Sequence, residues 1–246
     1  MARTRVEPVP NEPAAVASLG DEDALVVADY HAGIEEALRS DGLEVGSQAD
    51  TRREQLLSLV AETDADRVVF LGDLGHQFGA PEGPEREELD ALVAELPVPA
   101  TLVKGNHDGE LDSYFADVIP TEGAVRGGVG LLHGHTWPAP EVLDADVVCV
   151  GHEHPAVRLE DEVGGARVER AWLRGPLATD PFQDHYGEHV EADAELVVCP
   201  AFNDLCGGSW VNVEGQGFLS PFLPEAIPGA DAYLLDGTRL GPYRRV

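Results

Sequence analysis

Lysine is almost absent from this 246-residue sequence, which contains only Lys104. Lysine and arginine together number 16 against 46 aspartates and glutamates, so the formal net charge is −30. The acidic residues are spread along the whole chain, whereas an acidic face for a basic partner would require them to cluster. A dispersed acidic surface is typical of adaptation to concentrated salt, where screening weakens self-repulsion. We therefore expect a protein of a salt-rich cytoplasm.

Long apolar runs and paired cysteines are also missing. No segment approaches the length of a membrane span, and residues 1–13 lack the apolar core of a secretory signal, so we expect no membrane contact and a cytoplasmic location. The three cysteines lack paired CxxC spacing, which argues against a disulfide framework or a zinc ribbon. Cys149 and Cys199 lie in apolar runs and are expected to be buried thiols.

The first half of the chain alternates short apolar runs with amphipathic segments. Strands are predicted at residues 24–28, at residues 67–71 and directly before Gly105, and helices at residues 34–39, 51–62 and 85–96. Thr51 is the expected N-cap of the second helix, with Glu54 at the capping-box position. This alternation predicts right-handed crossovers onto a largely parallel sheet.

The second half is rich in strands, and helical periodicity is nearly absent after Ala116. Strands are predicted at residues 129–132, 147–150, 156–159, 166–173 and 196–199, with a further candidate at 209–213. A mixed or antiparallel second sheet packed on the first would give an α/β sandwich. Because no linker divides the chain, we expect one domain over residues 1–246, with a motif core at 24–200 and a flexible lead-in at 1–15.

Polar side chains follow directly on five of these strands. They are Asp29 with His31, Asp73, Asn106 with His107, His133 with His135, and His152 with His154. Ligand sites in α/β sheets lie at the carboxyl ends of the strands, so we expect these side chains to meet. Seven of the nine histidines lie in or beside these loops. The exceptions, His185 and His189, are predicted to lie in a solvated acidic loop.

Carboxylate, amide and imidazole groups without a thiol or thioether suit Mn²⁺, Fe or Zn²⁺ better than Mg²⁺ or Ca²⁺ alone. The set is larger than one ion needs. Two ions about 3.5–4 Å apart, bridged by one carboxylate, would use all of these ligands. Such a pair would lower the pKa of a bridging water and hold a phosphate between the ions.

The strand ends carry five motifs in chain order: DxH at residues 29–31, GD at 72–73, GNHD at 105–108, HGH at 133–135 and GHxH at 151–154. This order resembles that of the calcineurin-like metallophosphoesterase superfamily. Three further features are a GDLxH form that ends at His76, a GHEHP run that ends at Pro155, and PAFN at 200–203 with Gly207 and Gly208 after it. By these features the chain is most similar, within the superfamily, to archaeal phosphoesterases related to the nuclease subunit of the Mre11/SbcD group. The resemblance implies a two-sheet sandwich flanked by helices, in four layers α/β/β/α.

The resemblance also implies roles for individual residues by motif position. Asp29, His31 and His154 would hold one ion, Asn106, His133 and His152 would hold the other, and Asp73 would bridge them. His107 would bind no ion and would protonate the leaving oxygen or stabilise the transition state. Three further residues, Asp108, His135 and His76, would lie around the centre. Asp108 could orient the His107 imidazole or approach the site through water. His135 could lie behind the ligands or face the substrate.

The implied activity is hydrolysis of phosphodiester bonds by a metal-bridging hydroxide, with a nuclease among the candidates and Mn²⁺ preferred over Fe or Zn²⁺. A phosphomonoesterase, or a phosphodiesterase of small nucleotides, is an alternative on the same site. A non-catalytic metal-binding scaffold is a third, although intact ligands and an intact His107 argue against it. The substrate would be a phosphate ester, including nucleic acid or a nucleotide, and the sequence does not indicate an oligomeric state.

Overall fold

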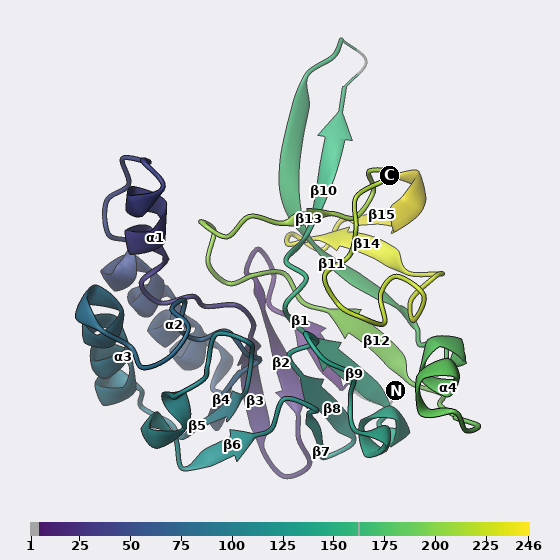
Figure 1. Cartoon of the computed structure of the whole chain (residues 1–246), viewed down its shortest axis with the longest axis horizontal. Coiled ribbons are helices and arrows are strands. Elements are labelled where there is room, and N and C mark those ends of the chain that lie inside the picture. Colours follow the sequence, from purple (N-terminus) through teal and green to yellow (C-terminus); the bar gives the residue numbers. More distant parts are fainter. Residues whose placement is uncertain (1–4, 162) are drawn as a thin grey trace.

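The computed structural model describes residues 5–161 and 163–246, in which two β-sheets pack against each other (Figure 1). The first sheet has six strands, and their order in the sheet is their order in the chain. They are β1 (Val6–Pro8), β2 (Ala14–Ser18), β3 (Asp23–Val27), β4 (Arg67–Phe70), β5 (Ala100–Val103) and β6 (Asp117–Ile119). Strands β3, β4 and β5 are parallel, as predicted, and β6, which was not predicted, runs parallel to β5. Strands β1 and β2 pair antiparallel at one edge.

Helices α2 (Ala49–Thr63) and α3 (Gly83–Glu95) cover the outer face of this sheet, and α1 (Ile34–Ser40) lies above them in the view of Figure 1. Strand alternation explains the packing, because successive side chains point to opposite faces. In β3, Leu25 and Val27 are buried with helix residues such as Leu56, whereas Ala24 and Val26 are buried against the second sheet.

The second sheet has nine strands in mixed directions. They are β7 (Ala124–Arg126), β8 (Val129–Leu132), β9 (Val147–Val150), β10 (Pro155–Glu160), β11 (Ala166–Pro176), β12 (Glu195–Val198), β13 (Ser209–Trp210), β14 (Asp231–Leu234) and β15 (Arg239–Pro242). Strands β8, β9 and β12 are parallel to one another, and β10 and β11 form an antiparallel hairpin, which projects from the body (Figure 1).

Helix α4 (Asp180–Tyr186) and the 3₁₀ helix η2 (Pro140–Asp144) lie on the outer face of the second sheet. Phe182 of α4 is buried there with Val148 and Val150, while Cys149 points to the opposite face, between the sheets. Cys199 is buried between the sheets as well, so both predicted buried thiols are confirmed. The two remaining 3₁₀ turns are η1 (Leu111–Tyr114) and η3 (Tyr243–Arg245).

The predicted fold class, an α/β protein with two sheets flanked by helices, is confirmed. Three local predictions are wrong. Thr51 is not an N-cap, because α2 begins at Ala49 after Gln48, whose backbone N–H donates to the buried Glu35 carboxylate at 2.8 Å. The expected flexible lead-in contains β1, which pairs with β2. His185 lies in α4, not in a solvated loop, and its ring stacks on Trp137 with ring centroids 4.0 Å apart.

None of the helices in the described residues is long and apolar enough to cross a membrane.

Candidate metal centre at the joined strand ends

The loops that follow β3 and β4 run side by side and are hydrogen-bonded through their backbones. His31 N–H donates to the Asp73 carbonyl at 2.9 Å, and Ala32 N–H donates to the Leu74 carbonyl at 2.8 Å. The second sheet contacts the same place, because a ring nitrogen of His133 donates to the Leu71 carbonyl at 3.0 Å. The carboxyl ends of strands from both sheets therefore meet at one site, as predicted.

The backbone at this site adopts an unusual conformation. Seven non-glycine residues in the described part of the chain have positive φ angles, and five of them are predicted ligands. These five are Asp29, His31, Asp73, His152 and His154, with φ between 45° and 65°. Left-handed conformations of non-glycine residues are costly and cluster at functional sites. Their concentration here indicates that the loops are shaped to aim these side chains.

Two glycines in the motifs are required by close approach. A Cβ at Gly72, which has φ of +86°, would lie 2.2 Å from Nδ1 of His133. A Cβ at Gly105 would lie 2.2 Å from Oδ1 of Asp73. Both glycines therefore leave room for predicted ligands.

Asp73 lies at the centre of the cluster and is buried. Its Oδ2 is 3.3 Å from Nε2 of His133, 3.8 Å from Nε2 of His31 and 3.9 Å from Nε2 of His107. Asp29, also buried, has Oδ1 3.2 Å from Nε2 of His154. Imidazoles from both sheets thus surround two buried carboxylates.

Four sets of side chains at the site could each hold a metal ion. Two of them are His31 with His76 and His107, and His31 with His154 and Cys206; the other two share Asp73. One set is Asp29, His31 and Asp73, and the other is Asp73, His133 and His152; within each set the ligand atoms lie within 4.8 Å of one another. The residues present therefore fit two neighbouring ions with one shared carboxylate.

The two remaining predicted ligands lie beside these sets. Oδ1 of Asn106 is 3.2 Å from Nε2 of His133, where it can join the second set. Nε2 of His154 is buried and lies 3.2 Å from Oδ1 of Asp29, where it can join the first. A buried imidazole nitrogen beside a buried carboxylate is a suitable pair of ligands for a cation.

Backbone carbonyls set the orientation of several imidazoles. Nδ1 of His133 donates to the Leu71 carbonyl, Nδ1 of His154 donates to the Gly207 carbonyl at 2.8 Å, and Nδ1 of His107 donates to the His76 carbonyl. With the proton held on Nδ1, Nε2 is left as the atom that faces the site. Such bonds fix the tautomer and ring orientation of metal-binding histidines.

The titratable groups at the site differ in the direction in which their pKa values are shifted. Burial opposes ionisation of Asp29 and Asp73, but the neighbouring imidazoles outweigh it, so the pKa of each carboxyl lies below its usual range. Burial lowers the pKa of His31 to about 3, and burial together with His133 lowers the pKa of His152 to about 4. His133 is the exception: burial would lower its pKa, but Asp73 and Asp29 raise it to about 9.

Asp108 ties two of the loops together. Its Oδ1 accepts hydrogen bonds from the backbone N–H groups of Leu74 at 2.8 Å and Gly75 at 3.2 Å, and its Oδ2 accepts one from Gly105 at 2.8 Å. Burial and the nearby Asp73 raise its pKa to about 6. Both oxygens bind backbone groups, so Asp108 positions the loops after β4 and β5.

His107 lies between two other rings at the edge of the site. The His76 ring is nearly parallel to it with centroids 5.3 Å apart, and Phe78, 78% exposed, stacks on it at 4.3 Å. Nδ1 of His76 is also 3.2 Å from Nδ1 of His31. His135 lies farther along, with its ring 5.3 Å from His133 and its Nδ1 buried without a hydrogen bond.

Three residues at the site were not predicted as members of it. Phe78 lies over His107, and Asn203 donates to the carbonyls of Tyr30 at 3.0 Å and His31 at 3.2 Å. Cys206 lies near His31 and His154, two of the predicted ligands. The PAFN motif resembles a family motif, and this was the only signal in the sequence that pointed to Asn203. Burial and Asp29 raise the pKa of the Cys206 thiol well above its usual range.

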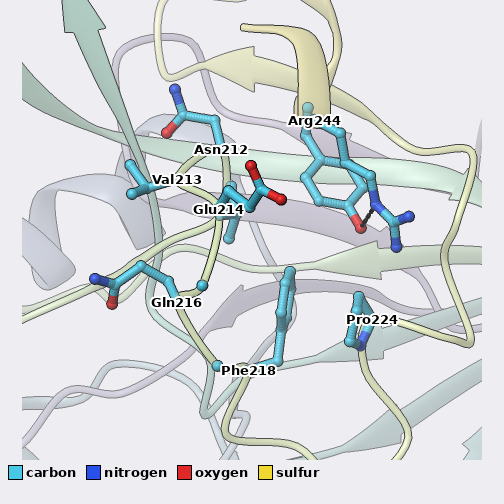
Figure 2. A pocket seen from close by; sticks show the side chains of 11 residues that line it. Asn212, Val213, Glu214, Gln216, Phe218, Pro224 and Arg244 are labelled. Carbon is cyan, nitrogen blue, oxygen red and sulfur yellow. Dashed lines mark hydrogen bonds between the residues drawn. The ribbon is translucent and has the colours of Figure 1, made fainter.

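A separate pocket lies between the 211–218 segment and the C-terminal residues (Figure 2). Phe218, Pro224 and Arg244 line it, and the Arg244 guanidinium donates to the Tyr243 hydroxyl at 2.9 Å. None of the predicted site residues lines this pocket.

The fold and the site together define an α/β sandwich with a candidate metal centre where the two sheets meet. The chain belongs to the calcineurin-like phosphoesterase superfamily, whose domain model matches residues 23–171. A phosphoesterase is a hydrolase, and divalent metal ions are general in this superfamily. No curated protein sequence matches the chain.

Among solved structures, the chain is similar to the nuclease MPE of Pseudomonas putida. The two share 19% sequence identity with a TM-score of 0.57, over 94% of this chain and 97% of that one. It also aligns with YfcE, a phosphoesterase from E. coli, at 16% identity and a TM-score of 0.39, over 89% of this chain and 96% of that one. At this identity, the likeness to the nuclease shows a common fold.

Proposed function

We propose that this protein is a phosphodiesterase that depends on two divalent metal ions. The observation that carries the proposal is the pair of candidate ligand sets that share Asp73, with His107 outside both. Asp29, His31 and His154 would hold one ion, Asn106, His133 and His152 the other, and Asp73 both. Mn²⁺ is the first candidate from the oxygen and imidazole ligands, with Fe and Zn²⁺ as alternatives.

When bound, the ions supply Lewis-acid chemistry, because they lower the pKa of a shared water and neutralise charge on the phosphoryl oxygens. The histidines that bind them must be neutral, a state that the low pKa values of His31 and His152 already favour. The backbone bonds made by Asp108 keep two of the ligand loops in register.

His107 would donate a proton to the leaving oxygen. Its Nδ1 is held by the His76 carbonyl, so the atom free to serve is Nε2, which lies 3.9 Å from Oδ2 of Asp73. The neighbouring rings of His76 and Phe78 restrict the imidazole to this orientation. A positioned imidazole of this kind contributes typically about 10²–10⁴-fold to a hydrolysis rate.

The charges at the site favour a diester over a monoester. In the part of the chain that the structure describes, the ion-pair partners of Asp29 and Asp73 are all histidines. A diester would bring one negative charge fewer than a monoester dianion to the neighbourhood of these two carboxylates. The exposed ring of Phe78 beside His107 is a surface on which a base or aryl group can stack.

Nucleic acid is the substrate class to test first, because the chain resembles the Mre11/SbcD group and shares its fold with a nuclease. The net charge of −30 would repel a polyanion in dilute salt, so we propose that the protein works in a salt-rich cytoplasm where this repulsion is screened. Phosphomonoesters and small nucleotides belong in the same substrate panel.

The decisive experiment compares wild type with His107→Ala in concentrated salt with Mn²⁺. The substrates are single-stranded DNA, a cyclic dinucleotide, a bis-aryl phosphate and a mono-aryl phosphate. We expect diester turnover in the wild type and a loss of at least about 10²-fold in the variant, with metal content unchanged. His189→Ala, which removes an imidazole that is 72% exposed, is the matched control and should keep full activity. A metal-loaded wild type that hydrolyses none of these esters would leave the scaffold alternative.

A further inference from the structure

Cys206 lies at the candidate metal centre, although the sequence around it has no cysteine spacing typical of a metal site. The residue belongs to the segment after β12 and is partly buried. Its Sγ and one nitrogen from each of His31 and His154 lie within 4.8 Å of one another. Both histidines are predicted ligands of the same ion, so the thiol approaches that ion's position.

The segment that carries Cys206 is attached to the site on both sides of the residue. Before it, the buried Asn203 side chain donates to the Tyr30 and His31 carbonyls, and the Asn203 N–H donates to the Asp29 carbonyl at 3.3 Å. After it, the Gly207 carbonyl accepts the hydrogen bond from Nδ1 of His154. The loop therefore orients one ligand histidine, contacts the backbone of another and places Cys206 between these two attachments.

The pair formed by His154 and Asp29 is a second feature beside the thiol that fits a cation. Nε2 of His154 is buried and lies 3.2 Å from Oδ1 of Asp29, its only partner among the described residues. A cation placed between Nε2 and Asp29 would satisfy both atoms.

We infer that Cys206 supplies a thiolate ligand to the ion held by Asp29, His31, Asp73 and His154. The inference rests on the proposed dimetal function. On binding, the S–H bond breaks, a metal–sulfur bond forms and the proton passes to solvent; the ion's own charge stabilises the thiolate. No oxidation or reduction takes place.

A thiolate changes which ion the centre selects. Sulfur is a soft ligand that favours Zn²⁺, Co²⁺ and Fe²⁺, whereas Mn²⁺ prefers oxygen ligands. Only the ion on the Asp29 side is within reach of Cys206, so the two ion positions should differ in which metal they bind most tightly. A centre with a sulfur-bound ion on one side and a harder ion on the other is the expected loaded form.

The test is the absorption spectrum of the full-length protein loaded with Co²⁺. Co²⁺ bound to any of these ligands gives visible d–d bands, whereas a sulfur-to-cobalt charge-transfer band in the near ultraviolet requires a thiolate ligand. We expect both in the wild type, and loss of only the charge-transfer band in Cys206→Ser and Cys206→Ala. The control is Cys199→Ala, which removes a thiol buried between the sheets and should keep the band.

The outcomes separate this inference from the proposal on which it rests. Visible bands without a charge-transfer band in the wild type would overturn thiolate ligation and leave the metal centre intact. A charge-transfer band that persists in both Cys206 variants would also overturn it, since another cysteine would then be the ligand. Failure of the wild type to bind Co²⁺ at all would overturn the metal centre and the inference together. Because the wild-type spectrum decides the first and third outcomes, the test holds even if a variant does not fold.

Discussion

Replacing Gly105 with alanine tests whether the position of Asp73 controls the site. The new methyl carbon would lie 2.2 Å from Oδ1 of Asp73 and 2.4 Å from its backbone nitrogen. Non-bonded heavy atoms rest roughly 3.5 Å apart, so Asp73 or the Gly105 loop must move by about 1 Å. The same Oδ1 accepts the backbone N–H of His107 at 2.9 Å, so that bond is disturbed as well.

A displacement of about 1 Å at a positioning group costs on the order of 10²-fold in rate, or about 2.7 kcal/mol in the activation barrier. We expect Gly105→Ala to lose that much turnover of a bis-aryl phosphate in Mn²⁺, and to bind Mn²⁺ more weakly by calorimetry. The matched control is Gly109→Ala in the same loop, where the nearest atom to the new carbon is 3.8 Å away. Wild-type turnover and metal affinity in a folded Gly105→Ala protein would refute the assignment of Asp73 as the shared ligand.

Three further outcomes follow from the same geometry. Adding a chelator should lower the unfolding temperature, because an ion at 100 times its Kd stabilises the native state by about 2.7 kcal/mol; a midpoint that is insensitive to Mn²⁺ concentration would contradict this. Since the pKa of His133 is raised to about 9, the metal-free protein carries that proton at pH 7.5 and must release it on binding. Metal affinity should therefore rise with pH until about 9, and calorimetry in buffers of different ionisation enthalpy should detect the released proton. Asp108→Asn should lower the free energy of unfolding, measured in denaturant, by roughly 1–3 kcal/mol, because an amide nitrogen cannot accept the Gly105 N–H. The control is Asp112→Asn, at the ion pair with Lys104, which should leave the free energy of unfolding nearly unchanged.

The fold and most of the candidate site could be predicted because their signals are local. Asp29 and Asp73 each follow directly on an apolar strand, and parallel strands bring their carboxyl ends to one edge. To predict which side chains meet at the site, it is enough to identify where each strand ends; no long-range contact has to be known in advance. The same reasoning placed the histidines of the second sheet once a second sheet was expected.

The errors arise where tertiary contacts override local preference. The start of α2 depends on a hydrogen bond from Gln48 to Glu35, a residue of a different helix, so a local capping pattern at Thr51 could not reveal it. Cys206 reaches the site because Ala201, five positions earlier, bridges to Ala28 at the end of β3. Nothing in the residues around Cys206 encodes that return to the first sheet.

The division of the predicted ligands between the sheets has a consequence for assembly. Asp29, His31, Asp73 and Asn106 follow strands of the first sheet, while His133, His152 and His154 follow strands of the second. The acidic and amide ligands thus come from the N-terminal half of the chain, whereas the second sheet contributes imidazoles and the inferred thiolate of Cys206. Each proposed ion also depends on the second sheet, because His154 would complete the ligands of one ion and His133 and His152 those of the other. Metal capture should therefore come late in folding, after the sheets have docked, and the ions would then fasten the two halves of the molecule together.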